Sequence, residues 1–241
     1  MKLRLLSLLA VLLFAGGVLL QLALSGGMVW ADVEAGVYGT QVAGGSLNLS
    51  CPLMLSSSEP GLITAVLANS LDRQVLPVVT AEISSAGGRQ SLSQPFALAA
   101  HETRIVQWPV DRSNVVFGGL ILANVIQGRY GELDPRQGSC GILVFSLFDL
   151  KGTAMLVLIS ISGIALVLTG GMLWRRLQAG PAERVEQTLK ACGGLAGVTT
   201  LALLTGLPRW WGLTLFLDAF ALIMLSVIFT EFLLFPKYQG S

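Results

Sequence analysis

Asp218 is the side chain whose type and placement point most directly to chemistry, because it lies inside a long apolar run. A free carboxylate at such a depth in a membrane costs several kcal/mol, so it usually binds an ion or proton or is neutralised by a partner. The alternative is a hydrogen bond to Thr199, Thr200 or Thr205 of the preceding apolar run, or a position near the membrane interface beside Trp210 and Trp211. One acid without a basic partner or a second acid makes a poor proton relay, which favours the hydrogen bond.

His101 is the only histidine, and we expect it in a surface turn. The Gly-x-Ser-x-Gly elbow that often presents a serine nucleophile to such a base does not occur. The Gly-Gly pairs at 87–88, 118–119 and 170–171 lack the spacing of a phosphate-binding loop or dinucleotide fingerprint. The sequence therefore predicts no catalytic residues, no cofactor and no enzyme.

Composition places the chain in a membrane. Of its 241 residues 53% are hydrophobic and 12% are charged, and the mean hydropathy is +0.72. Soluble domains carry about a quarter charged residues. A net charge of +1 creates no field that would gather nucleic acid. We expect an integral membrane protein whose first partner is the lipid bilayer.

The apolar residues are concentrated in four runs, each flanked by basic or aromatic residues. A run of roughly 21 residues makes a helix of about 31 Å, which crosses a hydrocarbon core. The predicted spans are Leu5–Ser25, Thr153–Leu173, Ala191–Leu207 and Leu213–Phe235.

Basic residues between these runs set the predicted orientation. They gather before the first run, between the second and third, and after the fourth: Lys2, Arg4, Arg175, Arg176, Arg184, Lys190 and Lys237. The positive-inside rule then places both termini and the loop 174–190 in the cytoplasm. The long segment 26–152 faces outward, so we expect a multi-pass plasma-membrane protein with its main domain extracytoplasmic.

The first run has two interpretations. Residues 1–27 form either a retained anchor or a cleaved signal peptide, since Val29-Trp30-Ala31 is an acceptable cleavage site. Residues 28–46, rich in glycine, are predicted to be a flexible linker. Residues 47–150 form the outer domain, and 151–241 form a three-helix membrane region.

The outer segment alternates short β-rich runs with turn chemistry, which predicts an all-β sandwich of the immunoglobulin-like kind. The expected strands are Leu47–Leu55, Leu62–Asn69, Val75–Ser84, Ser91–Leu98, Thr103–Val110, Leu120–Gln127 and Cys140–Phe148. Glycine, proline and serine interrupt every window that could be helical.

Four stretches of the outer segment resemble bacterial immunoglobulin-like modules, nearest to the CARDB type and similar to fibronectin type III. The stretches are Thr64–Ser70, Val79–Ile83, Leu98–Thr103 and Val106–Val110. They match a strand ending in Asn, a Val-rich strand, and a Leu-x-x-x-Glu turn before the next strand. Ala-His replaces the usual Pro-Gly of that turn. The resemblance covers about half of the outer domain and implies a fold without an activity.

In this topology the first and last strands run close together, so a Cys51–Cys140 disulfide is expected. It would close a loop of roughly 90 residues, worth about 4 to 5 kcal/mol. Two buried free thiols are the alternative. Cys192, in the third run, is interpreted as a packing residue, and no Cys/His cluster with metal-ligand spacing exists.

The third run also carries Gly193-x-x-x-Gly197, a spacing typical of closely packed membrane helices. The fourth run is its expected partner, because a short turn joins the two.

Two functions remain open. The first is a non-catalytic binding or accessory subunit of an envelope or membrane complex, whose sandwich contacts another protein or a polysaccharide. The alternative is a small transporter or channel component that uses Asp218.

The orientation gives a first prediction. A Gln187→Cys variant should resist a membrane-impermeant maleimide in intact cells and react after permeabilisation, because the loop 174–190 is expected inside. Cys192→Ser serves as the background. Ready labelling of intact cells would contradict the topology.

Overall fold

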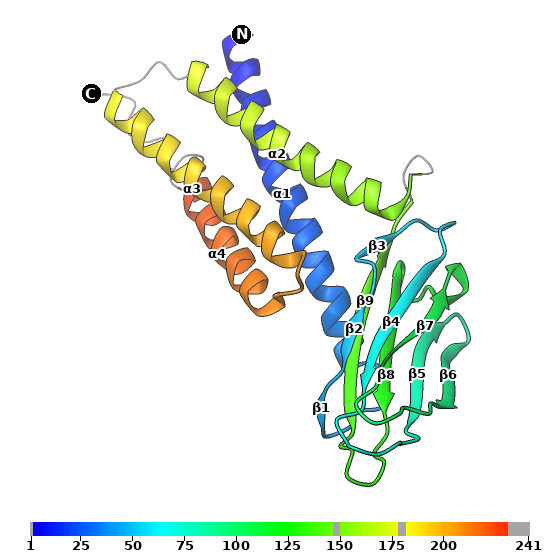
Figure 1. Cartoon of the computed structure of the whole chain (residues 1–241). Helices are drawn as coiled ribbons and strands as arrows, with labels where there is room; N and C mark the ends of the chain where they lie inside the picture. Colours follow the sequence, from blue (N-terminus) through cyan, green and yellow to red (C-terminus); the bar gives the residue numbers. More distant parts are fainter. Residues whose placement is uncertain (1, 147–149, 178–181, 231–241) are drawn as a thin grey trace. The chain divides into compact units, whose positions relative to one another are not determined.

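The computed structural model describes residues 2–146, 150–177 and 182–230, without the side chains of 2–4, 182–185, 188, 189 and 229. The chain forms two compact units (Figure 1). Met1–Val29 and Val157–Ser241 make a helical unit, and Trp30–Leu156 make a β-unit.

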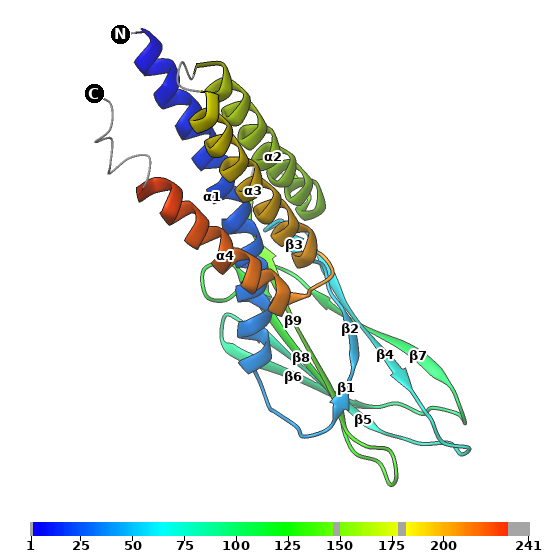
Figure 2. The same cartoon turned by 90° about the vertical axis from the view of Figure 1, so that its left-hand side faces the viewer.

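The helical unit is built from α1 (Lys2–Val37), α2 (Gly152–Leu177), α3 (Ala182–Gly206) and α4 (Trp211–Phe229) (Figure 2). The described stretches Leu5–Val37, Gly152–Leu177 and Trp211–Ile228 are long and apolar enough to cross a membrane. The third predicted span, Ala191–Leu207, falls mostly within α3. Among the described residues, α3 does not meet the length and hydropathy that the other three helices meet. The predictions for Lys237 and the end of the fourth span, Phe235, lie outside the described residues.

The predicted loop 174–190 is largely wrong as a loop. Helix α2 continues to Leu177 and α3 starts at Ala182. Arg175 and Arg176 occupy the last turn of α2, where cations interact favourably with the helix dipole. Lys190 pairs with Glu186 one turn earlier at 2.8 Å, which supports helix at the start of α3.

Helix α3 packs against α4, as predicted, but the predicted glycines do not make the contact. A Cβ on Gly193 or Gly197 would meet nothing within 4 Å. The buried side of α3 is instead formed by Cys192, Leu195, Thr199 and Ala202, a heptad-like spacing that turns both glycines away.

Helices α1 and α2 approach each other closely at glycine residues. A Cβ on Gly17 would lie 2.7 Å from the Gly163 carbonyl oxygen, and one on Gly170 would lie 2.5 Å from the Phe14 nitrogen. Small residues thus bring α1 and α2 together.

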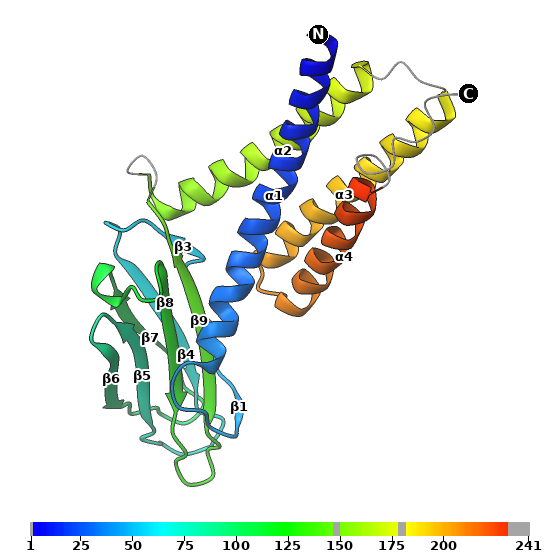
Figure 3. The same cartoon turned by 180° about the vertical axis from the view of Figure 1, so that it is seen from behind.

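The β-unit is a sandwich of two sheets (Figure 3). The larger sheet has the order β1-β9-β8-β5-β6, with β3 also paired to β9, and the smaller has the order β2-β4-β7. This is the strand arrangement of immunoglobulin-like sandwiches. The bounds are β1 Gly45–Ser46, β2 Asn48–Ser50, β3 Met54–Leu55, β4 Gly61–Ala68, β5 Val78–Ser85, β6 Gly88–Pro95, β7 Thr103–Val110, β8 Leu120–Gln127 and β9 Arg136–Val144.

Six of the seven predicted strands have a counterpart of similar extent, and the first one, Leu47–Leu55, breaks into β2 and β3, with β1 just before it. Between Gly45 and Leu55 the chain changes sheets twice: β1 and β3 pair with β9 in parallel, whereas β2 pairs with β4. The last strand begins four residues earlier than expected, at Arg136, because its first residues pair with Gln127 and its neighbours on β8. Its predicted end at Phe148 lies outside the described residues.

The core fills the space between the two sheets. Its largest fully buried members are Ile63 and Leu67 from β4, Ile83 from β5, and Ile121 and Ile142 from β8 and β9. Trp108 of β7 packs into the same cluster. Alternation along β4 and β7 sends every second side chain into this core, as a sandwich requires.

Strand β8 is buried along its whole length because both of its faces are covered. Ile121, Ala123 and Val125 join the inter-sheet core. Leu120 and Leu122 point the other way and pack against Ala31 and Ala35. These alanines belong to the last turns of α1, which lie on the outer side of the larger sheet.

The predicted flexible linker 28–46 is therefore wrong. Residues 28–37 are helical, because Ala31 and Ala35, one turn apart on α1, pack against Leu120 and Leu122 of β8. Beyond the helix, Val42 N–H donates to the Gln137 side chain at 2.7 Å and Gly45 N–H to the Pro135 carbonyl at 2.9 Å. A Cβ on Gly44 would lie 2.1 Å from that carbonyl, so close packing holds this segment.

Cys51 and Cys140 are joined in a disulfide, and Cys192 is a buried free thiol. Cys51 follows β2 directly, while Cys140 lies in β9. The bond links the chain just after β2 in the smaller sheet to β9 in the larger.

The disulfide gives a second prediction. Replacing both cysteines, Cys51→Ser with Cys140→Ser, should lower the unfolding free energy of the β-unit by about 4 to 5 kcal/mol, because the bond closes a long loop in the unfolded chain. Thermal unfolding of the full chain in mild detergent, followed by tryptophan fluorescence, measures it. Cys192→Ser is the control, and an equal change in both variants would contradict the assignment.

Candidate functional site

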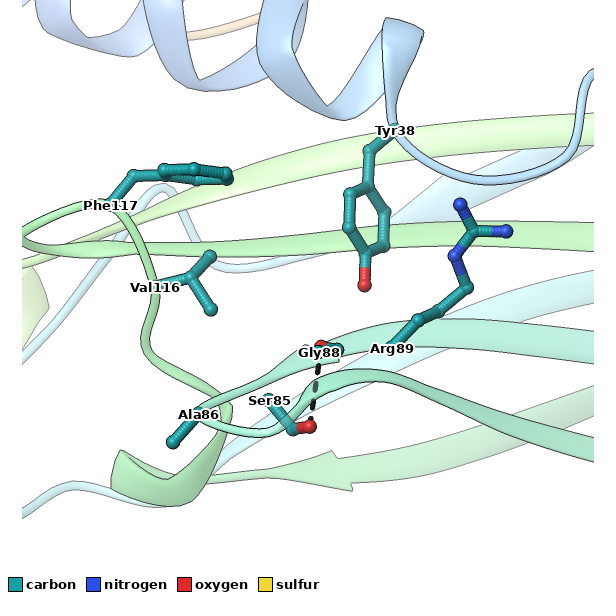
Figure 4. Close-up of a pocket in the computed structure, with 7 residues that line it drawn as sticks. All are labelled: Tyr38, Ser85, Ala86, Gly88, Arg89, Val116 and Phe117. Atoms are coloured by element: carbon teal, nitrogen blue, oxygen red, sulfur yellow. Dashed lines mark hydrogen bonds between the residues drawn. The ribbon is translucent and has the colours of Figure 1, made fainter.

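An open pocket of about 400 Å³ lies on the outer side of the larger sheet (Figure 4). The β5–β6 turn supplies one wall, the loop before β8 a second, and the residue after α1 a third. The lining residues are Tyr38, Ser85, Ala86, Gly88, Arg89, Val116 and Phe117.

Glu82 anchors the charged side of this pocket. Its carboxylate accepts hydrogen bonds from Thr40 N–H at 2.6 Å and from the Thr40 hydroxyl at 2.9 Å. Arg89 pairs with the same carboxylate at 3.3 Å. The Glu82 side chain is only 8% exposed, whereas that of Arg89 is 44% exposed. The pair is thus buried on the acidic side and open to solvent on the basic side.

The environment of Glu82 lowers its pKa. Burial alone would raise the pKa, but the hydrogen bonds from Thr40 and the nearby Arg89 guanidinium outweigh it. Gly39 permits this approach, because it has φ +85° and a Cβ there would lie within 3 Å of the Glu82 carboxylate.

Tyr38 joins the pocket through its ring and its hydroxyl. The Arg89 guanidinium carbon lies 5.4 Å from the ring centroid, within cation–π range. The buried hydroxyl makes no hydrogen bond of ordinary geometry with a described residue. Burial raises the pKa of Tyr38, and the nearby charge of Arg89 partly opposes that rise. The pocket therefore combines a half-exposed cation with an aromatic ring whose hydroxyl is buried.

Phe117 forms the apolar rim of the pocket, and Val116 lies beside it (Figure 4). Phe117 is 77% exposed, although its neighbour Val116 packs against the α1–β8 contact. No sequence motif singled out this pocket, because its parts come from three distant segments. The Gly-Gly pairs at 87–88 and 118–119 mark two of its turns and were the available signal.

The structure places Asp218 against α1, which sequence reasoning missed. The Ser25 hydroxyl donates to the Asp218 carboxylate at 2.8 Å. The same hydroxyl lies 3.0 Å from the Gln21 backbone carbonyl, and its single proton serves one acceptor at a time. Asp218 is half-buried.

The predicted threonine partners of Asp218 bond elsewhere. Thr199 donates to the Ala196 carbonyl of its own helix at 3.2 Å. Thr205 bonds the Ala202 carbonyl and lies 3.0 Å from the Thr214 hydroxyl of α4. Thr200 is partly exposed on α3. The prediction of a hydrogen-bonded acid thus acquires a different partner, and a transport role for Asp218 stays a prediction.

Gln21 lies one turn before Ser25 on α1. It is 1% exposed, and its side-chain nitrogen and oxygen find no hydrogen-bond partner among the described residues. The methylene carbon next to its amide faces Gly163 of α2. Gln21, Ser25 and Asp218 together form a polar stripe in an apolar unit.

The other reactive residues stay apart. His101 lies 2.7 Å from Asp72 on the exposed surface. No group of three His, Cys, Asp or Glu side chains able to hold a metal ion occurs within the residues that the structure describes.

No protein-family model matches the chain, and no curated protein matches it either. Solved structures do match part of the chain. A CARDB domain from Pyrococcus furiosus, solved with two metal ions, is 8% identical, with a TM-score of 0.31, and the match covers 42% of this chain and 86% of that one. The weak CARDB-like resemblance predicted from the sequence is thus confirmed.

Two enzymes also match in part. A cycloisomaltooligosaccharide glucanotransferase from Paenibacillus is 21% identical, with a TM-score of 0.34, over 43% of this chain and 14% of that enzyme. A superoxide reductase from Ignicoccus hospitalis is 7% identical, with a TM-score of 0.31, over 42% and 82%. This chain therefore corresponds to a small fraction of the glucanotransferase, and the fold assignment rests on strand order.

The Glu82 cluster gives a third prediction. Because the pKa of Glu82 lies below its ordinary value of 4.5, the ionised carboxylate stabilises the fold above that pH. The contribution is lost as the pH falls through the lowered pKa. Glu82→Gln should therefore melt lower than wild type at neutral pH, and the gap should close as the pH falls below about 4.

Glu132→Gln is the matched control, since Glu132 pairs with Arg73 at 3.2 Å on the exposed surface. Exposed pairs contribute about 0 to 1 kcal/mol, so this variant should melt close to wild type at every pH. A Glu82→Gln gap that does not depend on pH would contradict the assigned carboxylate contacts.

Proposed function

We propose that this protein is a membrane-anchored, non-catalytic accessory subunit whose immunoglobulin-like sandwich faces outside the cytoplasm and binds a protein partner. The observation that carries the proposal is an uncharged outer face on the smaller sheet. Its outward side chains are apolar or neutral polar and are here named the neutral face: Asn48, Ser50, Leu62, Thr64, Val66, Ala68, Thr103, Ile105, Gln107 and Pro109.

Registers bring the apolar members together. Val66 is paired with Ile105, and Leu62 with Pro109, with the neutral pair Thr64 and Gln107 between them. Ile105 is 63% exposed and Leu62 is 50% exposed. Interface cores are depleted of charged residues, whereas a face meant only for water usually carries them. The neutral face thus fits a protein partner better than solvent.

Anchorage is supported by the chain on both sides of the sandwich. Helix α1 continues through the Val29–Ala31 site without a break, and Ala31 is buried. Cleavage there would cut a helix whose last turns are part of the β-unit packing, which supports a retained anchor. On the other side, Gly152 at the start of α2 donates its N–H to Glu59 at 2.7 Å.

The basic residues support the outward orientation of the sandwich. Arg175 and Arg176 lie at the end of α2 that is remote from the β-unit along the chain. The positive-inside rule assigns that end to the cytoplasm. A partner is therefore expected among membrane or envelope proteins, and a polysaccharide is the competing partner.

A fourth prediction tests the neutral face. A photo-crosslinking amino acid at position 105 of the full chain should give one discrete adduct in native membranes. The same amino acid at Tyr130, an exposed residue of the β8–β9 loop, is the control and should give none.

Charge on the neutral face should abolish the adduct. Val66→Glu places a carboxylate beside position 105 and should remove it, whereas Val66→Thr keeps the shape without charge and should retain it. Equal adducts at 105 and 130, or an adduct that survives Val66→Glu, would refute a specific interface. An adduct of twice the chain mass would instead identify a second copy, and a heterogeneous smear would identify polysaccharide.

A further inference from the structure

Two exposed phenylalanines lie at one end of the sandwich, named here the aromatic end. Phe117 is 77% exposed and Phe145 is 52% exposed. They belong to neighbouring segments, because the Val144 N–H donates to the Gly119 carbonyl at 2.7 Å. Two aromatic rings thus leave the same end of the β-unit.

Phe117 is held there against a backbone preference. Its φ is +47°, in the left-handed region that bulky residues rarely adopt. Glycine would avoid this strain because it has no Cβ. Gly118 and Gly119 also have positive φ, so glycine already serves this turn elsewhere. The strained position therefore indicates a use for the ring itself.

The aromatic end is also the end from which a candidate membrane span begins. Leu143 pairs with Leu120 on one side and with Met54 on the other. A Cβ on Gly152 would lie 2.1 Å from the Met54 carbonyl, so the first residue of α2 lies at the same level. Lys151 precedes it, and an uncharged run starts at Thr153. The lipid hydrocarbon should begin close to this level.

The pocket lies within reach of that boundary. Ser84 is paired with Arg89, and the Leu122 N–H donates to the Ser84 hydroxyl, so Arg89 lies level with Leu122. Leu122 is two residues from Leu120, or about 7 Å along a strand. The polar headgroup layer is about 5 to 8 Å thick on each side of a bilayer. Arg89 therefore falls at headgroup depth when the aromatic end meets the hydrocarbon.

The chemistry of the pocket suits a phosphate group. One nitrogen of the Arg89 guanidinium pairs with Glu82, and a guanidinium carries five N–H donors in all. Guanidinium donors match phosphate oxygens in geometry. The Tyr38 ring lies against the Arg89 guanidinium, and Phe117 supplies an apolar wall (Figure 4).

We infer that the pocket binds the phosphate headgroup of a membrane lipid through Arg89, while Phe117 and Phe145 insert among the upper acyl chains. The inference rests on the membrane anchorage proposed above and is independent of the neutral face. It assigns the aromatic end a lipid occupant, and the strained Phe117 becomes the residue that holds the sandwich at the bilayer surface.

The test uses the full chain with Cys192→Ser and one new cysteine, at Phe117→Cys, carrying an environment-sensitive dye. After reconstitution into phosphatidylcholine vesicles, the dye should emit to the blue of its value in water. Lipids brominated near the top of the acyl chain should quench it at least two-fold more than a dye at Tyr130→Cys. Resistance of the protein to alkaline carbonate extraction checks anchorage separately.

Arg89 is tested in the same vesicles. Arg89→Gln should reduce quenching at position 117 about two-fold in phosphatidylcholine, Arg89→Lys should restore most of it, and neither should matter in digalactosyl-lipid vesicles, which lack phosphate. Melting temperatures identify any variant that fails to fold.

Three outcomes would overturn the inference. If the dye at position 117 emits as it does in water while the chain resists carbonate extraction, the lipid contact is refuted and the membrane anchorage is not. A blue-shifted dye that bromolipids do not quench would show that protein covers Phe117. Stabilisation of the detergent-solubilised chain by inorganic phosphate, dependent on Arg89 and without a lipid effect, would identify free phosphate as the ligand.

Discussion

The close approach of α1 to β9 at Gly141 is the contact on which the rest of the β-unit depends. A Cβ on Gly141 would lie 2.0 Å from the Ala31 carbonyl oxygen, so only glycine fits. The Gly141 N–H donates to the Asp32 carboxylate at 3.0 Å. This contact lets Ala31 and Ala35 cover Leu120 and Leu122, makes β8 a strand buried on both faces, and delivers Tyr38 and Thr40 to Arg89 and Glu82.

Local patterns in the sequence predicted most of the β-unit. Alternation and turn residues located β4, β5, β7 and β8 to within a few residues, because each stays in one sheet along its whole length. The first strand failed for the opposite reason. Its two pieces, β2 and β3, and the preceding β1 are placed by pairing with β4 and β9, which lie far away in the sequence.

Two predictions that relied on glycine are wrong. Residues 28–37 contain a glycine near their end and were read as a linker, yet the leucines of β8 supply the apolar surface on which a helix forms. Gly193 and Gly197 have the spacing of a helix contact, whereas Gly17, Gly163 and Gly170 make one. The pocket could not be predicted, since Tyr38, Arg89 and Phe117 become neighbours only through the folded sheet.

The Cys51–Cys140 bond has a further consequence for release of the outer domain by proteases. The chain before Cys51 leads back to α1 and the chain after Cys140 leads on to α2. One peptide-bond cleavage anywhere between the two cysteines leaves both halves covalently joined, each half with its own apolar helix. Even two such cleavages release only the excised stretch, so shedding the intact sandwich requires cuts outside the disulfide loop on both sides.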